Sequence, residues 1–560
     1  MHARLFLILA GLLSAPVPSN PPPTPALPPD VCEEPAAGPY NILMIVLDDV
    51  GTDKLAVYGE TDGSNAGPPC NPAPTCYPVP CDEPYPYAPT PSLDALAGCG
   101  ILFTNYYVNP LCSTTRAAMM TGRYAFRTGM GGLVGPTSKV EDAEVFIPEF
   151  LKLGFTPSSP YQCGAFGKWH LTHPSGNETH AVDNGFDFFA GPMGNNGDHF
   201  DWDKVTATSS GTSTDPQSAF DATETSADAL AWINGLASSQ RFFAYVSFNA
   251  PHSPYQVPPL DLLSLETQDY LTCTQPWGGP FVEGQEASNL HEQRVFYRAM
   301  LEAVDTEIGN LIENMDAEQK EKTVIIVVSD NGTPRVIIDP SEHPIGHGKS
   351  TVYQIGVRVP MIVAGPIVEQ EDRGEECAML VGAVDLWRTI GDITGASVAT
   401  LEAAVGPLAE HDGVSFATLI ADPGSPAVRE LAFSQTFNAN FAYDPTPHGP
   451  YEVGCPPQWF PPSNSPLLWC CDRVIFNGGH ARSITDGSYK LIRKLLTNGA
   501  DGGLDPGNPS TCLADTPPTY KNELYDISND PDEQTNLHSD TNPLSIETSL
   551  AAALEALSGK

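Results

Sequence analysis

The sequence predicts an α/β fold: a doubly wound, mostly parallel sheet followed by a smaller C-terminal α+β subdomain. Three stretches, Ile42 to Leu47, Phe242 to Phe248 and Thr323 to Val328, are continuous apolar runs, which is the pattern of strands buried on both faces. Helical stretches separate them along the chain. Strands that alternate with helices form parallel sheets, and the ligands of such sheets gather at the carboxyl ends of the strands.

The remaining elements follow in chain order. The helices expected are Val145 to Leu153, Thr225 to Leu236 and a long one from about Asn289 to Met315. Pro360 to Ala364 repeats the apolar pattern and predicts a fourth strand. Beyond residue 430 the strands shorten, as in Tyr489 to Arg493, and Pro543 to Leu557 closes the chain with a helix. This change of pattern predicts the separate C-terminal subdomain.

The chain has 560 residues and is expected to contain four segments. Leu5 to Leu13 is a short apolar run behind Arg4, which is typical of a secretory signal peptide. The predicted segments are a signal peptide at 1–19, a Pro-rich linker at 20–38, a catalytic α/β domain at 39–430 and the α+β subdomain at 431–560. Gly59 to Pro91 and Tyr443 to Cys471 are rich in turn residues and predict surface insertions.

The charge of the chain limits its partners. Lys and Arg number 27 against 68 Asp and Glu, a formal net charge of −41. So few cations exclude the basic surface that nucleic-acid binding requires. No apolar run beyond the signal peptide has the length of a membrane helix. We therefore expect an extracytoplasmic protein, secreted or periplasmic, with no membrane span.

The 13 cysteines fit an exported chain. If Cys112 is set apart, 12 remain, and an even number in an oxidising compartment predicts a disulfide framework. Cys70, Cys76 and Cys81 lie in a Pro-rich stretch without histidines. We expect them to form bridges that staple this loop rather than a zinc site.

Polar side chains follow the predicted strands. Asp48 and Asp49 come directly after the first strand, and Asp330 and Asn331 come after the third. Such hard oxygen ligands suit Ca²⁺ or Mg²⁺. His252 follows the second strand. Because equivalent strand ends meet at one edge of a parallel sheet, these residues predict a single metal site there.

A set of cations accompanies the predicted metal site in this otherwise acidic chain: Arg116, Lys168, His170, His252 and Lys349. Negative charge builds on the oxygens of a tetrahedral oxyanion ester when its bond is cleaved. Cations beside a divalent metal stabilise that charge. The set therefore predicts hydrolysis of such an ester.

The order of these motifs resembles the type I sulfatases, the arylsulfatase-like and formylglycine-dependent members of the alkaline-phosphatase superfamily. The matching segments are Asp48-Asp49-Val50-Gly51, Cys112 to Tyr124, Gly167-Lys168-Trp169-His170, Ala250-Pro251-His252, Ser329-Asp330-Asn331-Gly332, Gly348-Lys349-Ser350-Thr351, Gly356 to Pro360, Tyr489 to Ile492 and Glu523 to Asp526. The resemblance covers most of residues 39 to 540. It implies a sulfuric-ester hydrolase.

The resemblance also implies residue roles. Asp48, Asp49, Asp330, Asn331 and the residue made from Cys112 would hold the metal, usually Ca²⁺. A maturation enzyme would oxidise Cys112 to formylglycine, whose hydrated aldehyde is the nucleophile. Arg116 would steady that diol, and its i, i+4 spacing from Cys112 places both on one helix face. Lys168, His252 and Lys349 would bind the sulfate oxygens, with His252 a proton donor to the leaving alcohol, and His170 would accept the second diol proton.

One residue departs from the family pattern. Thr114 stands where the maturation motif Cys-x-Pro-x-Arg has proline, and proline favours the extended conformation that is read in the unfolded chain. Two alternatives to the sulfatase stay open: a non-catalytic metal-binding relative that binds sulfated ligands, and a phosphoester or phosphonate hydrolase. The substrate of the sulfatase would be an aryl sulfate or a sulfated sugar.

Overall fold

The computed structural model describes residues 38–59, 87–135, 138–155, 161–173, 177–273, 281–340, 342–437, 441–442, 451–452, 481–496, 519–539 and 543–557. The predicted signal peptide and all but the last residue of the predicted linker lie outside the described residues. So do residues 60–86 of the first predicted insertion and all of the second except 451–452.

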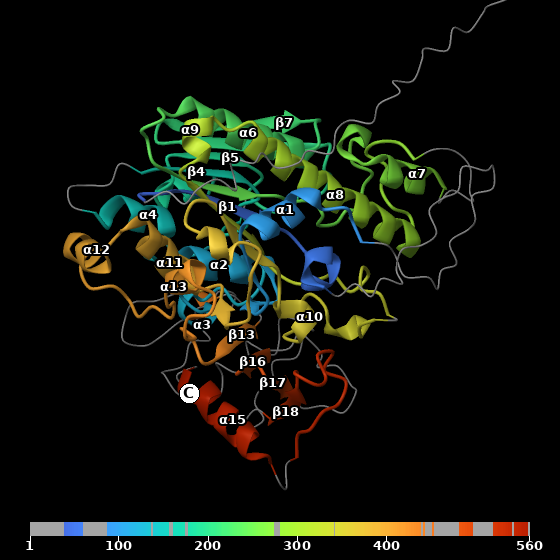
Figure 1. Ribbon diagram of the computed structural model, residues 1–560, viewed down its shortest axis with the longest axis vertical. Coiled ribbons are helices and arrows are strands. Elements are labelled where there is room, and N and C mark those ends of the chain that lie inside the picture. The colour runs from blue at the N-terminus through green and yellow to red at the C-terminus, as the bar shows by residue number, and fades with distance from the viewer. Residues whose placement is uncertain are drawn as a thin grey trace, which may run out of the picture.

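Ten strands form one large sheet, in the order β11-β2-β10-β9-β1-β8-β4-β5-β6-β7 (Figure 1). In that order their bounds are Glu376–Cys377, Ile101–Phe103, Met361–Ala364, Thr323–Ser329, Asn41–Leu47, Phe242–Ser247, Gln162–Gly167, Phe188–Gly191, Trp202–Thr208 and Gly211–Gln217. The five strands from β9 to β5 are parallel, and β10 and β6 add antiparallel pairs on either side. The predicted doubly wound, mostly parallel sheet is confirmed.

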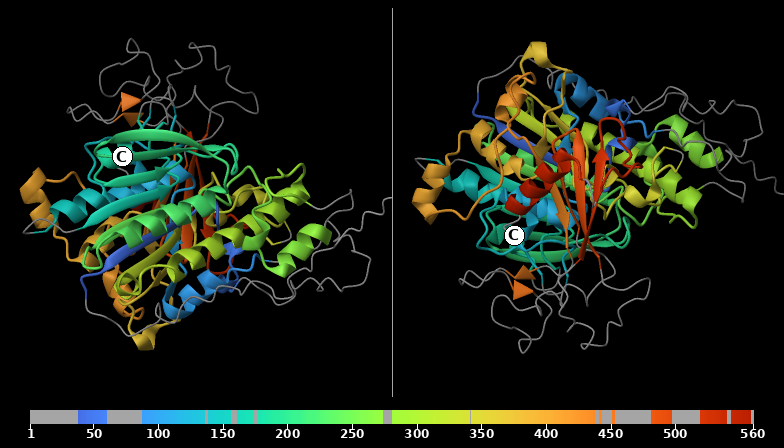
Figure 2. Two further views of the ribbon diagram at one scale, coloured as in Figure 1. Left: turned by 90° about the horizontal axis from the view of Figure 1, so that it is seen from above. Right: turned by 90° about the horizontal axis from the view of Figure 1, so that it is seen from below.

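Helices cover both faces of this sheet (Figure 2). The α-helices of the described residues are α1 Pro91–Cys99, α2 Cys112–Thr121, α3 Ala125–Thr128, α4 Ile147–Leu153, α5 His180–Asp183, α6 Asp221–Gly235, α7 Leu265–Cys273, α8 Leu290–Glu313, α9 Ala317–Lys320, α10 Gln354–Val357, α11 Asp385–Thr394, α12 Val398–Val405, α13 Ala417–Ala421 and α15 Ser545–Leu557, of which α15 packs on the C-terminal sheet. Short 3₁₀ helices are η2 Thr52–Lys54, η3 Ala56–Tyr58, η4 Leu260–Leu262, η5 Ile345–His347 and η6 Gln370–Asp372. The predicted helices correspond to α4, α6, α8 and α15.

Strand β1 shows why its sequence is apolar throughout. Ile42, Met44 and Val46 belong to one core cluster with residues of α2, α4 and α11. Leu43, Ile45 and Leu47 belong to the opposite cluster with residues of α1, α6 and α8. Successive side chains of a strand point to opposite faces, so a sheet covered by helices on both faces requires an unbroken apolar run.

A second, four-stranded antiparallel sheet lies in the C-terminal part of the chain, in the order β13-β16-β17-β18 (Figure 2). Its strands are Ala432–Thr436, Ala481–Thr485, Tyr489–Leu496 and Thr519–Asp526. Leu550 and Leu554 of α15 join the core with side chains of this sheet. Two-stranded pairs are β3 (Tyr106–Tyr107) with β12 (Val381–Gly382) and β14 (Phe441–Ala442) with β15 (Tyr451–Glu452). The boundary at residue 430 stays a prediction.

The cysteines correct one expectation. Cys99 is disulfide-bonded, as an exported chain predicts. Cys163 and Cys377, however, are free thiols like Cys112, and their side chains are fully buried. The even remainder of 12 is therefore not a complete set of bridges, because two of its members pack in the core as small apolar side chains. Cys70, Cys76 and Cys81 lie outside the described residues.

Within the described parts of the chain, no helix has both the length and the apolar composition that crossing a membrane requires.

Candidate active site

The carboxyl edge of the parallel sheet gathers the predicted site residues. Leu47 of β1 lies opposite Ser329 of β9, and Gly167 of β4 lies opposite Ser247 of β8. Asp48-Asp49, Asp330-Asn331 and Lys168 are the next residues of their strands, so the register brings them together at one edge. His252 arrives from the loop after β8. The predicted meeting of strand ends at one site is confirmed.

Helix α2 presents Cys112 to this edge. Cys112 is the first residue of α2 and is fully buried. Its Sγ lies 3.2 Å from Asn331 Oδ1, 3.7 Å from Asp48 Oδ1 and 3.5 Å from Lys349 Nζ. The sulfur therefore stands at the centre of residues that come from β1, β9 and the Lys349 segment.

Three carboxylates of the site each face a cation. Lys168 Nζ donates to Asp48, and Lys349 Nζ donates to Asp49. Arg116 Nε donates to Asp330 Oδ2 at 2.9 Å. The three acidic side chains are almost completely buried. Buried charge is stable only when it is paired, so each cation neutralises one carboxylate.

Arg116 is the most extensively bonded of these cations. Beyond Asp330, its Nη1 donates to the backbone oxygen of Lys168 at 2.8 Å, to Ser247 Oγ at 2.5 Å and to Tyr245 Oη at 3.3 Å. Its side chain is fully buried. The guanidinium therefore ties together α2, β4, β8 and β9, which a single ammonium group could not do.

The two histidines of the site differ in exposure. His252 Nδ1 contacts the backbone oxygen of Ser253 at 2.7 Å, and Nε2 lies 3.8 Å from Asp49 Oδ2, with the side chain 12% exposed. His170 has a left-handed backbone at φ 56° and is 5% exposed. Its Nδ1 makes no hydrogen bond within the described residues. His252 thus turns its Nε2 toward the site, and His170 keeps an unused ring nitrogen in the interior.

Burial and charge set the protonation of these groups. Burial lowers the pKa of His170 well below 6.5, and Lys168 and Arg116 add to the effect. Burial also raises the pKa of the Cys112 thiol to about 12, with Asp330 acting in the same direction. Burial would raise the pKa of Asp49, but Lys349 and His252 outweigh it and the pKa is lowered. At neutral pH the site therefore holds a neutral imidazole, a thiol and an ionised carboxylate.

The oxygen donors fit a hard cation. Asp48 and Asp49 offer carboxylate oxygens that lie within 4.8 Å of each other and of the ligand atoms of Cys112, a sulfur, and His252, a nitrogen. Asp330 Oδ1 accepts from the backbone N–H of Asp49 at 3.4 Å, which places it beside the same cluster. Asp48, Asp49 and Asp330 bring three negative charges to one buried point beside their three cations, and a metal ion bound there would add positive charge between them. A set of carboxylate and amide oxygens is what Ca²⁺ or Mg²⁺ binds.

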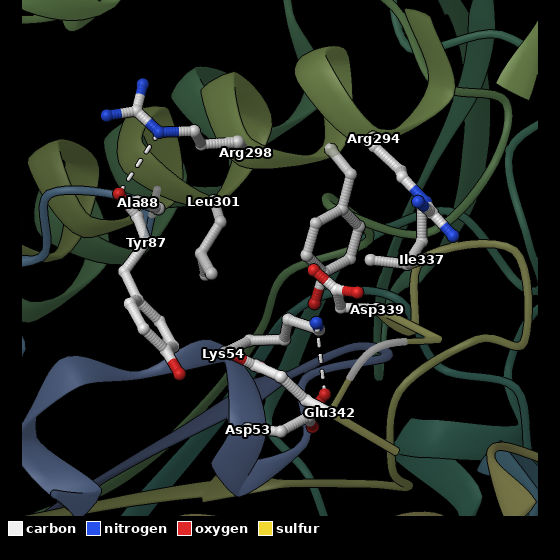
Figure 3. Close-up of a pocket in the computed structure, with 11 residues that line it drawn as sticks. Asp53, Lys54, Tyr87, Ala88, Arg294, Arg298, Leu301, Ile337, Asp339 and Glu342 are labelled. Atoms are coloured by element: carbon white, nitrogen blue, oxygen red, sulfur yellow. Dashed lines mark hydrogen bonds and ion pairs between the residues drawn. The ribbon is translucent and has the colours of Figure 1, made fainter. Parts of the chain in front are cut away.

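A small cavity is lined by residues that include Asp53, Lys54 and Arg294 (Figure 3). Tyr297 lines it and donates its hydroxyl to the backbone oxygen of Asp49 at 2.8 Å. Lys54 pairs with Asp53 at 3.0 Å, and Arg294 donates to the backbone oxygens of Val336 and Ile338. These cations are already paired, so the cavity supports the Asp49 loop and does not extend the cationic site.

Sequence reasoning missed Tyr245 and Ser247, which hold Arg116 from β8. Ser247 is the last residue of β8, so the same strand-end rule that identified Asp48 and Asp330 would have found it. Tyr245 could not be found in this way, because an aromatic residue within an apolar strand is expected to pack in the hydrophobic core. Strand β4, which delivers Lys168, was not predicted either, since Gly164 and Gly167 weaken its strand pattern.

Thr114 occupies the third position of α2 and is fully buried. Its Oγ1 has no hydrogen-bond partner within the described residues. The backbone N–H of Thr115 donates to the backbone oxygen of Leu111, the residue before α2, at 3.1 Å, and this bond closes the first turn of the helix. Thr114 comes one residue earlier, in the first turn of α2, where a backbone N–H has no acceptor within the helix. A proline at this position would therefore cost no intrahelical hydrogen bond.

The fold is a mostly parallel sheet covered by helices, with acidic and cationic side chains gathered at its carboxyl edge, and the comparisons give the family. Residues 40–396 match the family described as Sulfatase, and the chain belongs to that family. The chain is 27% identical to N-acetylgalactosamine-6-sulfatase of Homo sapiens over 373 residues, which cover 59% of this chain and 58% of that protein. It is 26% identical to arylsulfatase A of Homo sapiens over 524 residues, which cover 90% of this chain and 84% of that protein.

The first curated relatives are matched over only part of their length. For arylsulfatase J of Mus musculus, 26% identical, the match covers 54% of this chain and 48% of the relative. Solved structures share the fold over more of the chain. A sulfatase from Pseudoalteromonas sp. superimposes with a TM-score of 0.59 at 18% identity, covering 93% of this chain and 89% of that one. A protein in complex with its substrate D-glucosamine-2-N,6-O-disulfate gives 0.60 at 16% identity, covering 94% and 97%.

Proposed function

We propose that the protein is a sulfuric-ester hydrolase whose nucleophile is made from Cys112. One observation carries the proposal: Cys112 Sγ lies within 3.7 Å of Asp48, Asn331 and Lys349 in a buried site built from three cation–carboxylate pairs. A buried cysteine has no structural need for such surroundings. They suit a reaction that places an anionic group next to this residue.

The high pKa of the Cys112 thiol, about 12, supports its modification. A thiol that stays protonated at neutral pH is a poor nucleophile. Formylglycine at this position would supply a hydrated aldehyde, whose second hydroxyl allows the sulfate to leave. Ca²⁺, or Mg²⁺ in its place, would be held by Asp48, Asp49, Asp330 and Asn331 and by that residue, and would withdraw charge from a sulfate oxygen.

The other side chains have roles that follow from their places. Lys168, His252 and Lys349 bind the sulfate oxygens, and the partial exposure of the last two marks the side from which substrate enters. His252 would give a proton to the leaving alcohol from Nε2 of its doubly protonated ring, because its Nδ1–H donates to the backbone oxygen of Ser253. Burial lowers the pKa of His252, so the ring would take up this proton beside the negative charge of the bound sulfate. His170 is neutral and accepts a proton, because its pKa is lowered. Arg116 holds Asp330 in place.

The substrate we propose is a sulfated carbohydrate, with aryl sulfates as simpler alternatives. N-acetylgalactosamine-6-sulfatase among the relatives supports this choice. We also propose that the protein is exported and matured by a formylglycine-generating enzyme. The disulfide of Cys99 supports export. Thr114 in the motif favours one second candidate, a relative that binds sulfated ligands without turnover.

Release of sulfate from N-acetylgalactosamine 6-sulfate and from p-nitrophenyl sulfate tests the proposal, with p-nitrophenyl phosphate as the competing ester. We expect sulfate release that Cys112→Ala abolishes. Cys377→Ala is the matched control, because Cys377 is also a buried free thiol but lies on edge strand β11. Turnover of the phosphate ester alone would favour the phosphoester hydrolase, and binding of the sulfated sugar without turnover would favour the non-catalytic relative.

A further inference from the structure

The segment that carries Lys349 lies between the two sheets. On one side, the backbone N–H of Lys349 donates to the oxygen of Thr333 at 2.8 Å, and that of Ser350 donates to the oxygen of Pro110 at 2.9 Å. On the other side, the segment from His343 to Gln354 contacts the C-terminal sheet and the loop after it. Figure 1 shows α10, at the end of this segment, beside β17 and β18.

The first group of contacts is a buried ion pair beneath α10. Lys490 of β17 lies 3.2 Å from Glu533, and both side chains are 1% exposed. Glu533 Oε2 accepts from the backbone N–H of Gln354 at 2.6 Å, and Lys490 Nζ donates to Gln354 Oε1 at 3.2 Å. The pair therefore holds the first residue of α10 through both its main chain and its side chain.

The second group surrounds Tyr353. Its hydroxyl donates to Glu523 Oε2 of β18 at 2.7 Å, and Lys494 Nζ lies 4.4 Å from the centre of its ring. The ring of His347 stacks on Tyr353 with centroids 3.6 Å apart, and His347 Nδ1 contacts the backbone oxygen of Asp532 at 3.0 Å. His347 and Tyr353, which flank Lys349 in the sequence, are thus bound to β18 and to the loop after it.

The same sheet also contacts the segment that leads to Cys112. Ser434 Oγ of β13 donates to the backbone oxygen of Val108 at 2.6 Å, and the backbone N–H of Gln435 donates to Asn109 Oδ1 at 3.0 Å. Asn109 in turn accepts from Thr115 Oγ1 of α2 at 2.9 Å. One small sheet therefore holds both the approach to Cys112 and the segment of Lys349.

We propose that the C-terminal sheet positions Lys349 relative to Cys112, and that Glu533 and Tyr353 are the positioning residues through which it acts. The proposal rests on the proposed function, in which Lys349 binds the sulfate group. Neither residue touches the reacting atoms. Their effect is to fix the ammonium group that lies 3.5 Å from Cys112 Sγ, and small displacements of such groups weaken binding strongly.

The inhibition constant of inorganic sulfate measures this effect, because it does not depend on the fraction of folded enzyme. In the full-length protein, Glu533→Gln removes the charge that faces Lys490 while keeping an acceptor for Gln354. We expect the inhibition constant to rise about tenfold and kcat/KM to fall in parallel. Lys349→Ala gives the upper limit of the effect. Tyr353→Phe, which keeps the stacked ring, is the second variant and should change the same constant in the same direction.

Glu547→Gln is the matched control. Glu547 is a buried carboxylate of α15 that pairs with His538 at 2.5 Å and makes none of the contacts to the Lys349 segment described above. We expect it to lower the melting temperature without changing sulfate inhibition. An unchanged inhibition constant in folded Glu533→Gln and Tyr353→Phe would overturn the proposal, as would an equal rise in Glu547→Gln.

Hydrogen exchange read by mass spectrometry keeps the two proposals apart. Peptides that contain Lys349 and Ser350 should exchange faster in Glu533→Gln than in the wild type or in Glu547→Gln. Their N–H groups keep their acceptors, Thr333 and Pro110, but a segment held less firmly at Gln354 breaks these hydrogen bonds more often. This readout needs no activity. A wild-type protein without sulfate turnover or inhibition would contradict the proposed function alone, whereas unchanged exchange would contradict the positioning by Glu533.

Discussion

Replacing Arg116 by methionine should destabilise the protein strongly. Arg116 is fully buried, lies 2.8 Å from Asp330 Oδ2 through Nη2 and donates to the backbone oxygen of Lys168 at 2.8 Å. Methionine fills a similar volume but leaves Asp330 without its cation. Removing one partner of a buried ion pair costs about 3–5 kcal/mol, because the remaining charge stays buried and uncompensated.

Urea unfolding in the presence of a chelator measures this loss, because a metal ion held by Asp330 would itself compensate the charge of that carboxylate. The control is Arg493→Met, since Arg493 forms a pair with Glu555 whose side chain is 62% exposed. Such surface pairs contribute about 0–1 kcal/mol. We expect the urea midpoint to fall markedly for Arg116→Met and hardly at all for Arg493→Met, in low and in high salt. Equal midpoints for wild type and Arg116→Met would refute the view that Arg116 neutralises Asp330.

Three further predictions concern the metal, the pH and the thiols. A chelator should lower the melting temperature and stop sulfate release, with Ca²⁺ restoring both, because the clustered carboxylates then repel one another; an unchanged melt with no metal by elemental analysis would contradict the site. Because the pKa of His170 is lowered in the fold, the unfolded chain binds the extra proton below about pH 6.5. Urea midpoints should therefore fall as the pH drops from 7 to 5, and His170→Asn should reduce this slope; equal slopes would exclude His170 as the cause. Alkylation after denaturation without reductant should label Cys163 and Cys377 and spare Cys99, and the reverse pattern would contradict the buried thiols.

The sequence predicted the parts of the fold that depend on local pattern. The apolar runs of β1, β8 and β9 are buried on both faces, so each run is long enough to be recognised. Strand β4 and the hairpin of β6 and β7 escaped prediction. Gln162–Gly167 contains two glycines, and Gly211–Gln217 is an exposed polar edge strand, so their pairing is fixed by neighbouring strands rather than by their own residues.

The candidate site was predictable as a set of residues but not as a network. Strand ends and the family resemblance supplied Asp48, Lys168 and Lys349, which the structure brings together. Their pairing, with Lys168 on Asp48 and Lys349 on Asp49, depends on side-chain geometry across the sheet. The two free core cysteines could not be predicted for the same reason, since counting cysteines says nothing about which of them meet.

The decisive measurement is mass spectrometry of the peptide across Cys112 to Arg116, on protein from the native host. The account predicts formylglycine at position 112, at least in part of the molecules, together with sulfate release. Thr114→Pro should raise the modified fraction and the activity in the same proportion, because the first turn of α2 accepts proline and the motif is then complete. An unmodified thiol in every molecule, with no sulfate release, would contradict the account.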